Sequence, residues 1–184
     1  MAQRVNMAAP SASSPPPPGL ATANPVRSGA SPLFLTEPEL RRGIELLHFG
    51  QAHLLRALDA ILTPRGLGRA HQRALYFIAR QPNLSVSDLL RLLAVTKQSL
   101  GRVVADLVAQ ELVEIRPGTL DRRQRLLRLT PAGATLEADL YRRLSTVLGA
   151  AYAAAGQDAV DGFWAVLEGL IPPVERARIP ALRR

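Results

Sequence analysis

Cysteine is absent from all 184 residues of this chain. Its absence excludes disulfide bonds, thiolate metal sites and a cysteine redox switch. The sequence also lacks an apolar run near the roughly 18 residues of a membrane-spanning helix. No apolar stretch typical of a secretory signal precedes its main part. We therefore expect a cytoplasmic protein.

Acidic residues are a minority, 15 against 23 lysines and arginines, which gives a net charge of +8. This excess favours acidic partners, nucleic acid first and an anionic membrane surface second. Hydrophobic residues make up 47% of the chain. That is enough for a core, and the length suits one compact domain with a tail.

The motifs of several enzyme classes are also missing. We find no nucleophile–base constellation, P-loop or dinucleotide-binding fingerprint in the sequence. The three histidines lack the HExxH spacing of a zinc site, and no cysteine supplements them. We therefore expect neither an enzyme nor a protein that holds a metal or another cofactor.

Residues 84–130 have the order of elements of a helix-turn-helix followed by a β-hairpin. A first helix is predicted from about Val86 to Leu93, with Ser85 as N-cap and Asp88 three residues later. A second helix follows from the N-cap Thr96. Its apolar positions have the i, i+3, i+4, i+7, i+8 spacing of one buried face: Leu100, Val103, Val104, Leu107 and Val108.

The leading end of the second helix carries the residues predicted to contact DNA: Thr96, Lys97, Gln98, Ser99 and Arg102. A lysine in a first helical turn opposes the helix dipole at a cost of roughly 0.3–1 kcal/mol, which a phosphate contact would explain. Gln98 and Arg102 lie one turn apart, and both residue types read base edges in the major groove. The alternative is a solvated polar face.

A basic loop follows between two predicted strands, 112–115 and 126–130, with Pro117-Gly118 as a turn signal. Five arginines and a single acidic residue lie between positions 116 and 128. Basic side chains at a hairpin tip enter the minor groove or hold phosphates. The residues predicted for this wing are Arg116, Asp121, Arg122, Arg123 and Arg125.

Apolar helices are predicted outside this segment, over about residues 37–62, 69–80, 131–155 and 160–171. Their stripes are wider than one small winged domain needs, and pairing across a two-fold axis would bury them. We therefore expect a homodimer, with a self-packed monomer as the alternative. The fold class predicted is mainly α-helical: a winged helix-turn-helix with a small β-hairpin wing and N- and C-terminal dimerisation helices.

The predicted domain order has five parts. They are a disordered Pro/Ala/Ser-rich extension over 1–32, an N-terminal dimerisation helix over 33–66, a DNA-binding lobe over 67–130, C-terminal dimerisation helices over 131–172 and a basic tail over 173–184.

Three motifs resemble the MarR (multiple antibiotic resistance regulator) family of bacterial winged-helix transcription factors. They are VTKQSLGRVVADLVAQELVE at 95–114, Asp121-x-Arg123, and LRLTPAG at 127–133. The likeness covers about residues 38–171, and LGRAHQRALYFI at 67–78 is similar to a branch found in GC-rich bacteria. Gly101 departs from the bulkier polar residue often found there. The resemblance implies interleaved terminal helices in a dimer, with Asp121 orienting the wing and Arg123 in the minor groove.

The resemblance also implies a small effector, commonly aromatic or anionic, between the dimerisation helices and the DNA-reading lobe. The side chains expected to line its site are His48, His53, His71, Tyr76, Arg80 and Trp164. A histidine or tryptophan in an amphipathic helix is more often packed than in contact with a ligand. That alternative applies to each of them.

The function predicted is a homodimeric, sequence-specific transcription regulator, a repressor in preference to an activator, with no membrane partner. It would bind double-stranded DNA at a pseudo-palindromic operator, with two recognition helices about 34 Å apart. The alternatives are a sequence-neutral nucleic-acid-binding or architectural protein and an enzyme. Gln98 and Ser99 favour base readout over the sequence-neutral alternative.

Overall fold

The computed structural model describes residues 35–118 and 121–176. The predicted extension, 1–32, and the last eight residues of the predicted basic tail, 177–184, lie outside the described residues. By their contacts, residues 1–41 and 42–184 form two units. Helix α1, Glu37–Arg56, begins in the first unit and continues in the second.

The described part of the first unit is the start of α1. The backbone N–H and the hydroxyl of Thr36 donate to Oε2 of Glu39, at 2.8 and 2.9 Å. An ion pair between Glu37 and Arg41 follows one turn later. These contacts confirm the predicted helix start, with its N-cap threonine and a glutamate three residues on.

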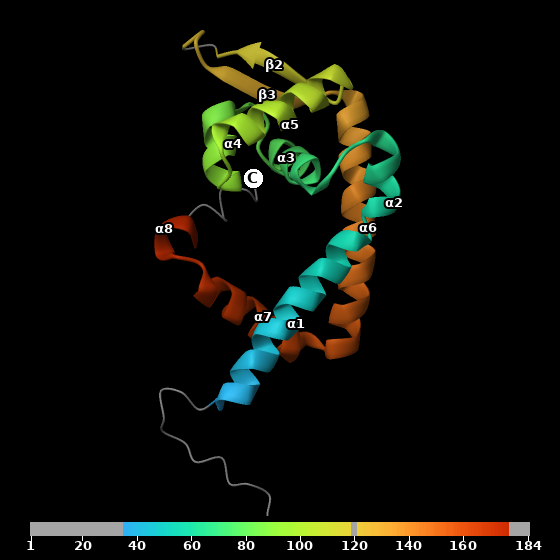
Figure 1. Ribbon diagram of the computed structural model, residues 1–184, viewed down its shortest axis with the longest axis vertical. Helices are drawn as coiled ribbons and strands as arrows, with labels where there is room; N and C mark the ends of the chain where they lie inside the picture. The colour runs from blue at the N-terminus through green and yellow to red at the C-terminus, as the bar shows by residue number, and fades with distance from the viewer. Residues whose placement is uncertain (1–34, 119–120, 177–184) are drawn as a thin grey trace, which may run out of the picture. The chain divides into compact units, whose positions relative to one another are not determined.

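The second unit combines helices with a small antiparallel sheet. Its further elements are α2 (Asp59–Leu62), the 3-10 turn η1 (Thr63–Arg65), α3 (Arg69–Arg80), β1 (Leu84–Ser85), α4 (Val86–Leu93), α5 (Lys97–Ala109), β2 (Val113–Pro117), β3 (Arg125–Leu129), α6 (Pro131–Ala155), α7 (Gln157–Leu170) and α8 (Pro173–Arg176). Figure 1 shows α3, α4 and α5 gathered beside the β2–β3 hairpin. The predicted fold class, mainly helical with a hairpin wing, is confirmed.

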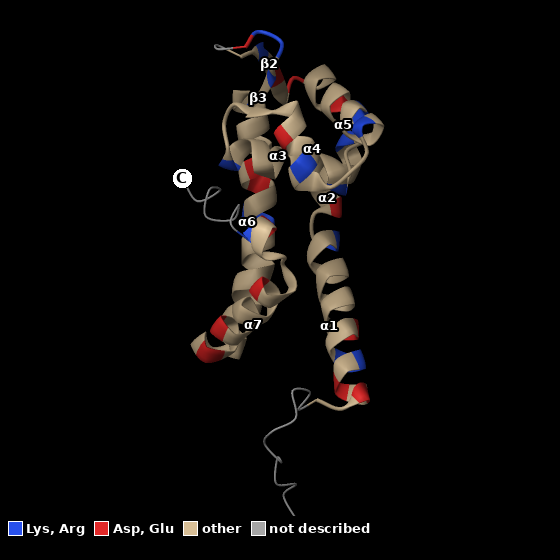
Figure 2. Ribbon diagram, turned by 90° about the vertical axis from the view of Figure 1, so that its left-hand side faces the viewer, with Lys and Arg blue, Asp and Glu red and all other residues tan. Residues whose placement is uncertain are grey.

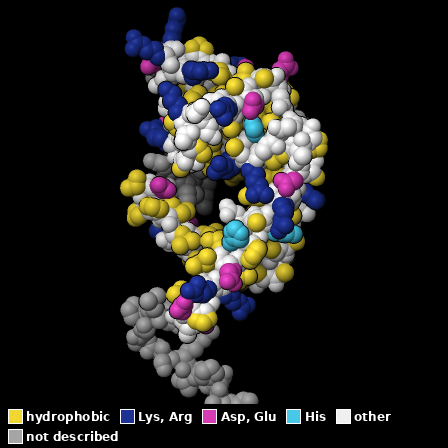
Figure 3. Space-filling view, in the orientation of Figure 1, with side chains coloured by type: hydrophobic (Ala, Val, Ile, Leu, Met, Phe, Trp, Pro, Cys, Tyr) yellow, Lys and Arg dark blue, Asp and Glu magenta, His cyan; other side chains and the backbone are white. Residues whose placement is uncertain are grey.

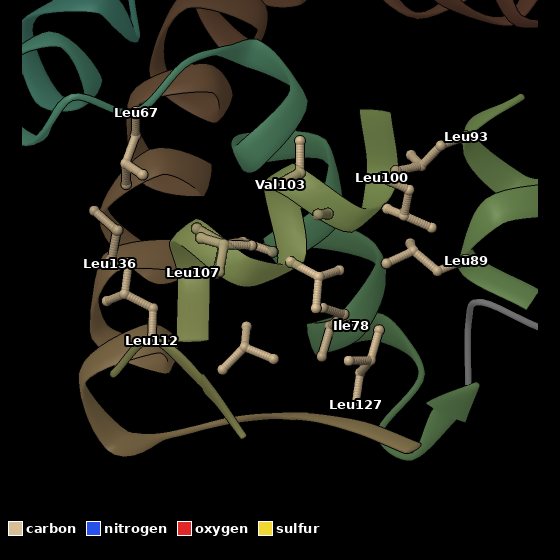
Figure 4. Close-up of a cluster of buried hydrophobic side chains, with 14 of the residues drawn as sticks. Leu67, Ile78, Leu89, Leu93, Leu100, Val103, Leu107, Leu112, Leu127 and Leu136 are labelled. Carbon is tan, nitrogen blue, oxygen red and sulfur yellow. The ribbon is translucent and has the colours of Figure 1, made fainter. Parts of the chain in front are cut away.

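The core of this unit is built around α5 (Figure 4). Its buried face meets α3, α4, β3 and α6 through Ile78, Leu89, Leu93, Leu100, Val103, Leu107, Leu127 and Leu136. Each large apolar side chain that is fully buried contributes roughly 1.5–3 kcal/mol. Val108 was predicted to be buried but is 37% exposed. At 100° per residue it lies roughly 80° around the helix from Leu100, at the edge of the buried stripe.

The prediction of one helix up to Leu62 was wrong. Helix α1 ends at Arg56, and α2 begins only at Asp59. Between them the chain turns so that Leu58 is fully buried. The carbonyl oxygen of Ala57 then accepts a hydrogen bond from Nε of Arg143 in α6, at 3.3 Å. Burial of one leucine and this side-chain cap together explain the interruption.

The sheet has a strand that the sequence did not predict. Strand β1 pairs with β3, which lies between β1 and β2, and Leu84 is opposite Leu127. Asn83, in the left-handed region with φ of 67°, donates its N–H to the carbonyl oxygen of Leu127 at 3.1 Å. A two-residue strand is too short for a period-2 pattern to reveal it.

A close backbone contact fixes the start of α6 against the sheet. The hydroxyl of Thr130 accepts from the N–H of Gly133 at 3.0 Å and donates to the carbonyl oxygen of Glu111 at 2.6 Å. A Cβ atom at Gly133 would overlap the carbonyl oxygen of Leu112. The glycine in LRLTPAG is therefore required by packing between α6 and the residue before β2.

Candidate nucleic-acid interface

Two side-chain caps set the geometry of the helix-turn-helix. Ser85 accepts from the N–H of Asp88 at 3.1 Å, and Thr96 accepts from the N–H of Ser99 at 3.2 Å. Ala94 makes the turn in the left-handed region, with φ of 50°. The Ser85 hydroxyl also donates to the Asp88 carboxylate at 2.6 Å, and with Arg91 it lowers the pKa of that carboxyl. Both predicted caps are confirmed.

The predicted DNA-contacting residues of α5 share one exposed surface. The N-cap Thr96 and the α5 residues Lys97, Gln98, Ser99 and Arg102 are all exposed, while Leu100, Val103 and Val104 of the same helix are buried. Within the described part of the chain, the side chains of Lys97, Gln98 and Arg102 have no hydrogen bond or ion pair. Their donors are therefore available to an external partner.

The polar row of α5 continues into an internal anchor, which the sequence reading missed. Asp106 and Gln110 follow Gln98 and Arg102 at intervals of four residues. Oδ2 of Asp106 lies 3.1 Å from Nε2 of His71 in α3. Nε2 of Gln110 donates to the carbonyl oxygen of Arg65 at 3.2 Å. Among the described residues, Gln98 and Arg102 at the N-terminal end of the row have no partner, whereas Asp106 and Gln110 at its C-terminal end are hydrogen-bonded. The i, i+4 spacing was its signal.

The tip of the β2–β3 hairpin is folded by Asp121. Its Oδ1 atom accepts the backbone N–H of Arg123 at 2.9 Å, and its carbonyl oxygen accepts the N–H of Gln124 at 3.0 Å. Gly118 then donates its N–H to the carbonyl oxygen of Gln124. These bonds hold the tip with the Arg123 backbone turned toward Asp121.

The predicted arginines of the wing differ in their surroundings. Arg116 is paired with Glu114, with Nη2 of the arginine and Oε1 of the glutamate 2.8 Å apart. Arg122, Arg123 and Arg125 are exposed and have no carboxylate partner among the described residues. Figure 2 shows this basic loop beside β2. Such a cluster suits the phosphates of nucleic acid, whose neutralisation releases counterions.

A pocket of about 470 Å³ lies between α1, α3 and α6. Its lining residues are Leu54, Gln72, Tyr76, Tyr141, Leu144, Ser145, Leu148, Gly149 and Tyr152. Of the six residues predicted for an effector site, the structure places Tyr76 alone in this lining. The sequence did not reveal Gln72, Tyr141 and Tyr152, which line the pocket together with Tyr76.

The other five predicted effector residues are spread over the second unit. His71 is bonded to Asp106, and Nε1 of Trp164 donates to the hydroxyl of Tyr152 at 3.1 Å. His48 packs edge-on against Phe49, with ring centroids 5.3 Å apart. His53 and Arg80 are exposed. The structure does not bring these five side chains together around one cavity.

No helix in the described ranges is long and apolar enough to cross a membrane. Among residues 35–118 and 121–176, no three His, Cys, Asp or Glu side chains gather as a metal site requires.

Sequence comparisons connect this geometry with known proteins. A family profile described as MarR family matches residues 65–124. The HTH-type transcriptional regulator PetP of Rhodobacter capsulatus is 44% identical over 155 residues, which cover 84% of this chain and 93% of PetP. The similarity therefore extends well beyond the helix-turn-helix into the flanking helices.

Solved structures show the same fold. A mutant MarR of E. coli in complex with operator DNA matches with a TM-score of 0.60 and 24% identity, over 77% of this chain and 100% of that one. CouR from Rhodococcus jostii RHA1, bound to p-coumaroyl-CoA, matches with a TM-score of 0.61 and 21% identity, over 71% and 92%. At these identities the likeness establishes the winged-helix fold.

Proposed function

The chain belongs to the MarR family of transcriptional regulators, and from this premise we propose that it is a homodimeric repressor acting at a pseudo-palindromic operator. The family is one of DNA-binding transcription regulators, which are not enzymes. Repression needs only that the operator overlaps a promoter. An activator would also need a surface for the transcription machinery.

The observation that carries this proposal is the unpartnered polar face at the start of α5. Lys97, Gln98 and Arg102 are exposed, and among the described residues none of them has an internal partner. In the proposed complex Lys97 binds phosphate, while Gln98 and Arg102 read base edges in the major groove. Thr96 and Ser99, at the start of α5, contact the sugar-phosphate backbone of the DNA. The wing arginines 122, 123 and 125 lie in the adjacent minor groove or on its phosphates.

Exposed apolar side chains support the proposed dimer. In α1 the exposed fractions of Ile44, Leu46 and Phe49 are 70%, 62% and 66%, and in α7 those of Val166 and Leu170 are 63% and 64%. Figure 3 shows hydrophobic side chains at the surface over α7. Large contiguous apolar surfaces are uncommon on monomers, so we assign the predicted regions 33–66 and 131–172 to dimerisation.

A small molecule in the pocket between α1, α3 and α6 would relieve repression. CouR, a structural neighbour, binds p-coumaroyl-CoA, and the present pocket joins predicted dimerisation helices to a helix of the DNA-reading lobe. A ligand that favours one spacing of the two recognition helices lowers the affinity for an operator that needs another.

The test is a titration of the purified protein against DNA upstream of its own gene and against random DNA, at several salt concentrations. We expect saturable binding of one dimer per site to the upstream fragment at salt concentrations where random DNA is not bound. Equal and steeply salt-dependent binding to both fragments would favour the sequence-neutral nucleic-acid binder instead. A monomer at micromolar concentration in analytical ultracentrifugation would overturn the dimer.

A further inference from the structure

Gln72 is the single buried polar residue in the part of the chain that the structure describes, with 7% of its surface exposed. It lies in the first turn of α3 and lines the 470 Å³ pocket. No described residue forms a hydrogen bond with its carboxamide. Since the described residues include no buried side-chain nitrogen or oxygen without a partner, the amide atoms of Gln72 are accessible from outside the protein although most of the residue is buried. Because Gln72 lines the pocket, its accessible amide can form a hydrogen bond with a molecule bound there.

Apart from Ser145 and Gly149, the other walls of the pocket are apolar or phenolic. Leu54, Leu144 and Leu148 provide aliphatic surface, and Tyr76, Tyr141 and Tyr152 provide three aromatic rings. Among the described residues that line the pocket, none is Lys, Arg, His, Asp or Glu. A carboxylate placed here would lose its hydration without gaining a counter-charge, which is costly in proportion to its burial.

We propose that this pocket binds an uncharged, predominantly aromatic molecule with one hydrogen-bonding group, and that the carboxamide of Gln72 recognises that group. A carboxamide can both donate and accept, so an amide, phenol or ketone on the ligand would satisfy it. Aromatic rings of the ligand would pack on the three tyrosines in offset or edge-on geometry. This choice of ligand class departs from the anionic effector that the sequence resemblance implied.

The position of Gln72 also explains how occupancy would reach the DNA-binding helix. The preceding residue, His71, holds Asp106 of α5 at 3.1 Å. One turn of α3 therefore carries the ligand-recognising amide on one side and the α5 anchor on the other. A ligand that shifts this turn shifts the anchor of α5 with it. This second step rests on the proposed function, whereas ligand binding does not.

The binding test uses two probes of nearly equal shape, 2-naphthamide and 2-naphthoate, titrated into the full-length protein by isothermal calorimetry at pH 7. We expect the neutral amide to bind about tenfold tighter or more than the carboxylate, because the latter must shed its hydration without a counter-charge. Equal affinity, tighter binding of the carboxylate, or no binding of either probe would overturn the proposal. This comparison requires no variant and so does not depend on how a mutant folds.

Gln72→Leu tests the recognising residue, and Gln81→Leu is its matched control. Gln81 ends the same helix, is exposed and does not line the pocket. Gln72→Leu should weaken 2-naphthamide about tenfold with its unfolding midpoint retained, and Gln81→Leu should leave that affinity unchanged. Unchanged amide binding in a folded Gln72→Leu protein would exclude the assigned role.

Operator binding separates this inference from the proposed function. Without a probe, Gln72→Leu should bind the upstream fragment as the parent protein does, since Gln72 lies away from the exposed face of α5. If the parent protein binds the amide but not the operator, the proposed function fails and the pocket assignment stands. If it binds the operator but neither probe, the pocket assignment fails alone.

Discussion

The imidazole of His71 connects two parts of the DNA-reading lobe, with Nε2 lying 3.1 Å from Oδ2 of Asp106 in α5. Its Nδ1 atom accepts the backbone N–H of Gly68 at 3.0 Å, at the start of α3. An accepting Nδ1 carries no proton, so the proton of the neutral ring is on Nε2 and is donated to Asp106. One side chain thus caps α3 and holds α5.

His71→Ala should therefore lower both stability and operator affinity. Its side chain is only 13% exposed and forms two hydrogen bonds, so we expect a loss of roughly 1–3 kcal/mol in unfolding free energy, measured by urea denaturation. Asp106→Asn retains an acceptor for Nε2 and should lose less. A larger loss for Asp106→Asn than for His71→Ala would contradict the anchor.

Gln98→Ala tests base reading by the exposed face of α5. Gln98 has no partner inside the described structure, so the fold should not change. We expect a loss of roughly 1–3 kcal/mol in binding to the cognate site, measured by fluorescence anisotropy, and almost none on random DNA. Equal losses on both DNAs would show that Gln98 acts without reading bases.

Arg123→Ala tests phosphate or minor-groove contact at the wing. The Asp121 carboxylate binds the backbone of Arg123 rather than its guanidinium, so the tip should keep its fold. If the side chain neutralises one phosphate, the salt dependence of log Kd should become shallower by about 1 for cognate and random DNA alike.

Arg116→Ala is the matched control for the wing. Its guanidinium forms an ion pair with Glu114 at 2.8 Å. The pair has no net charge in the free protein, so Arg116 adds little positive charge for a DNA phosphate. We expect a smaller change in the salt slope than for Arg123→Ala. A larger change in the salt slope for Arg116→Ala than for Arg123→Ala would show that the wing contacts phosphate at its base rather than at its tip.

Gly133→Ala tests the packing of α6 on the residue before β2. An added Cβ would overlap the carbonyl oxygen of Leu112, which is backbone and cannot rotate away. We expect a large loss of stability, on the order of 3 kcal/mol or more, in thermal and urea unfolding. Gly101→Ala is the control, because nothing lies within 4 Å of its Cβ position. That substitution should stabilise the protein by up to about 1 kcal/mol.

The parts of the site that could be predicted are those with a local cause. Ser85 and Thr96 were recognised because a cap needs one hydroxyl at a helix start, and the buried face of α5 because its period is helical. The anchor of Asp106 on His71 joins residues 35 apart, and the break at Leu58 depends on Arg143, 86 residues from Ala57. The i, i+4 spacing indicates the position of Asp106 on α5 but not its distant partner, and the break at Leu58 has no local signal. The six residues of the effector site stay a prediction; Tyr76 alone lines the pocket between α1, α3 and α6, because a pocket wall depends on helix packing rather than on residue type.

Glu137→Gln should stabilise the protein at neutral pH. Burial raises the pKa of the Glu137 carboxyl above its ordinary value of 4.5, and the charge of Arg80 offsets part of that shift. The folded state therefore holds this proton more tightly than the unfolded state, and stability falls as pH rises from the unfolded to the folded pKa. The glutamine variant lacks this loss, so its advantage in unfolding free energy should appear at pH 7 and vanish below about pH 4. Arg80→Met removes the attraction and should raise the pKa of Glu137 further, so this variant should lose more stability between pH 4 and pH 7 than the parent protein does. A difference between Glu137→Gln and the parent that stays the same from pH 4 to pH 7 would show that packing, and not ionisation, is its cause.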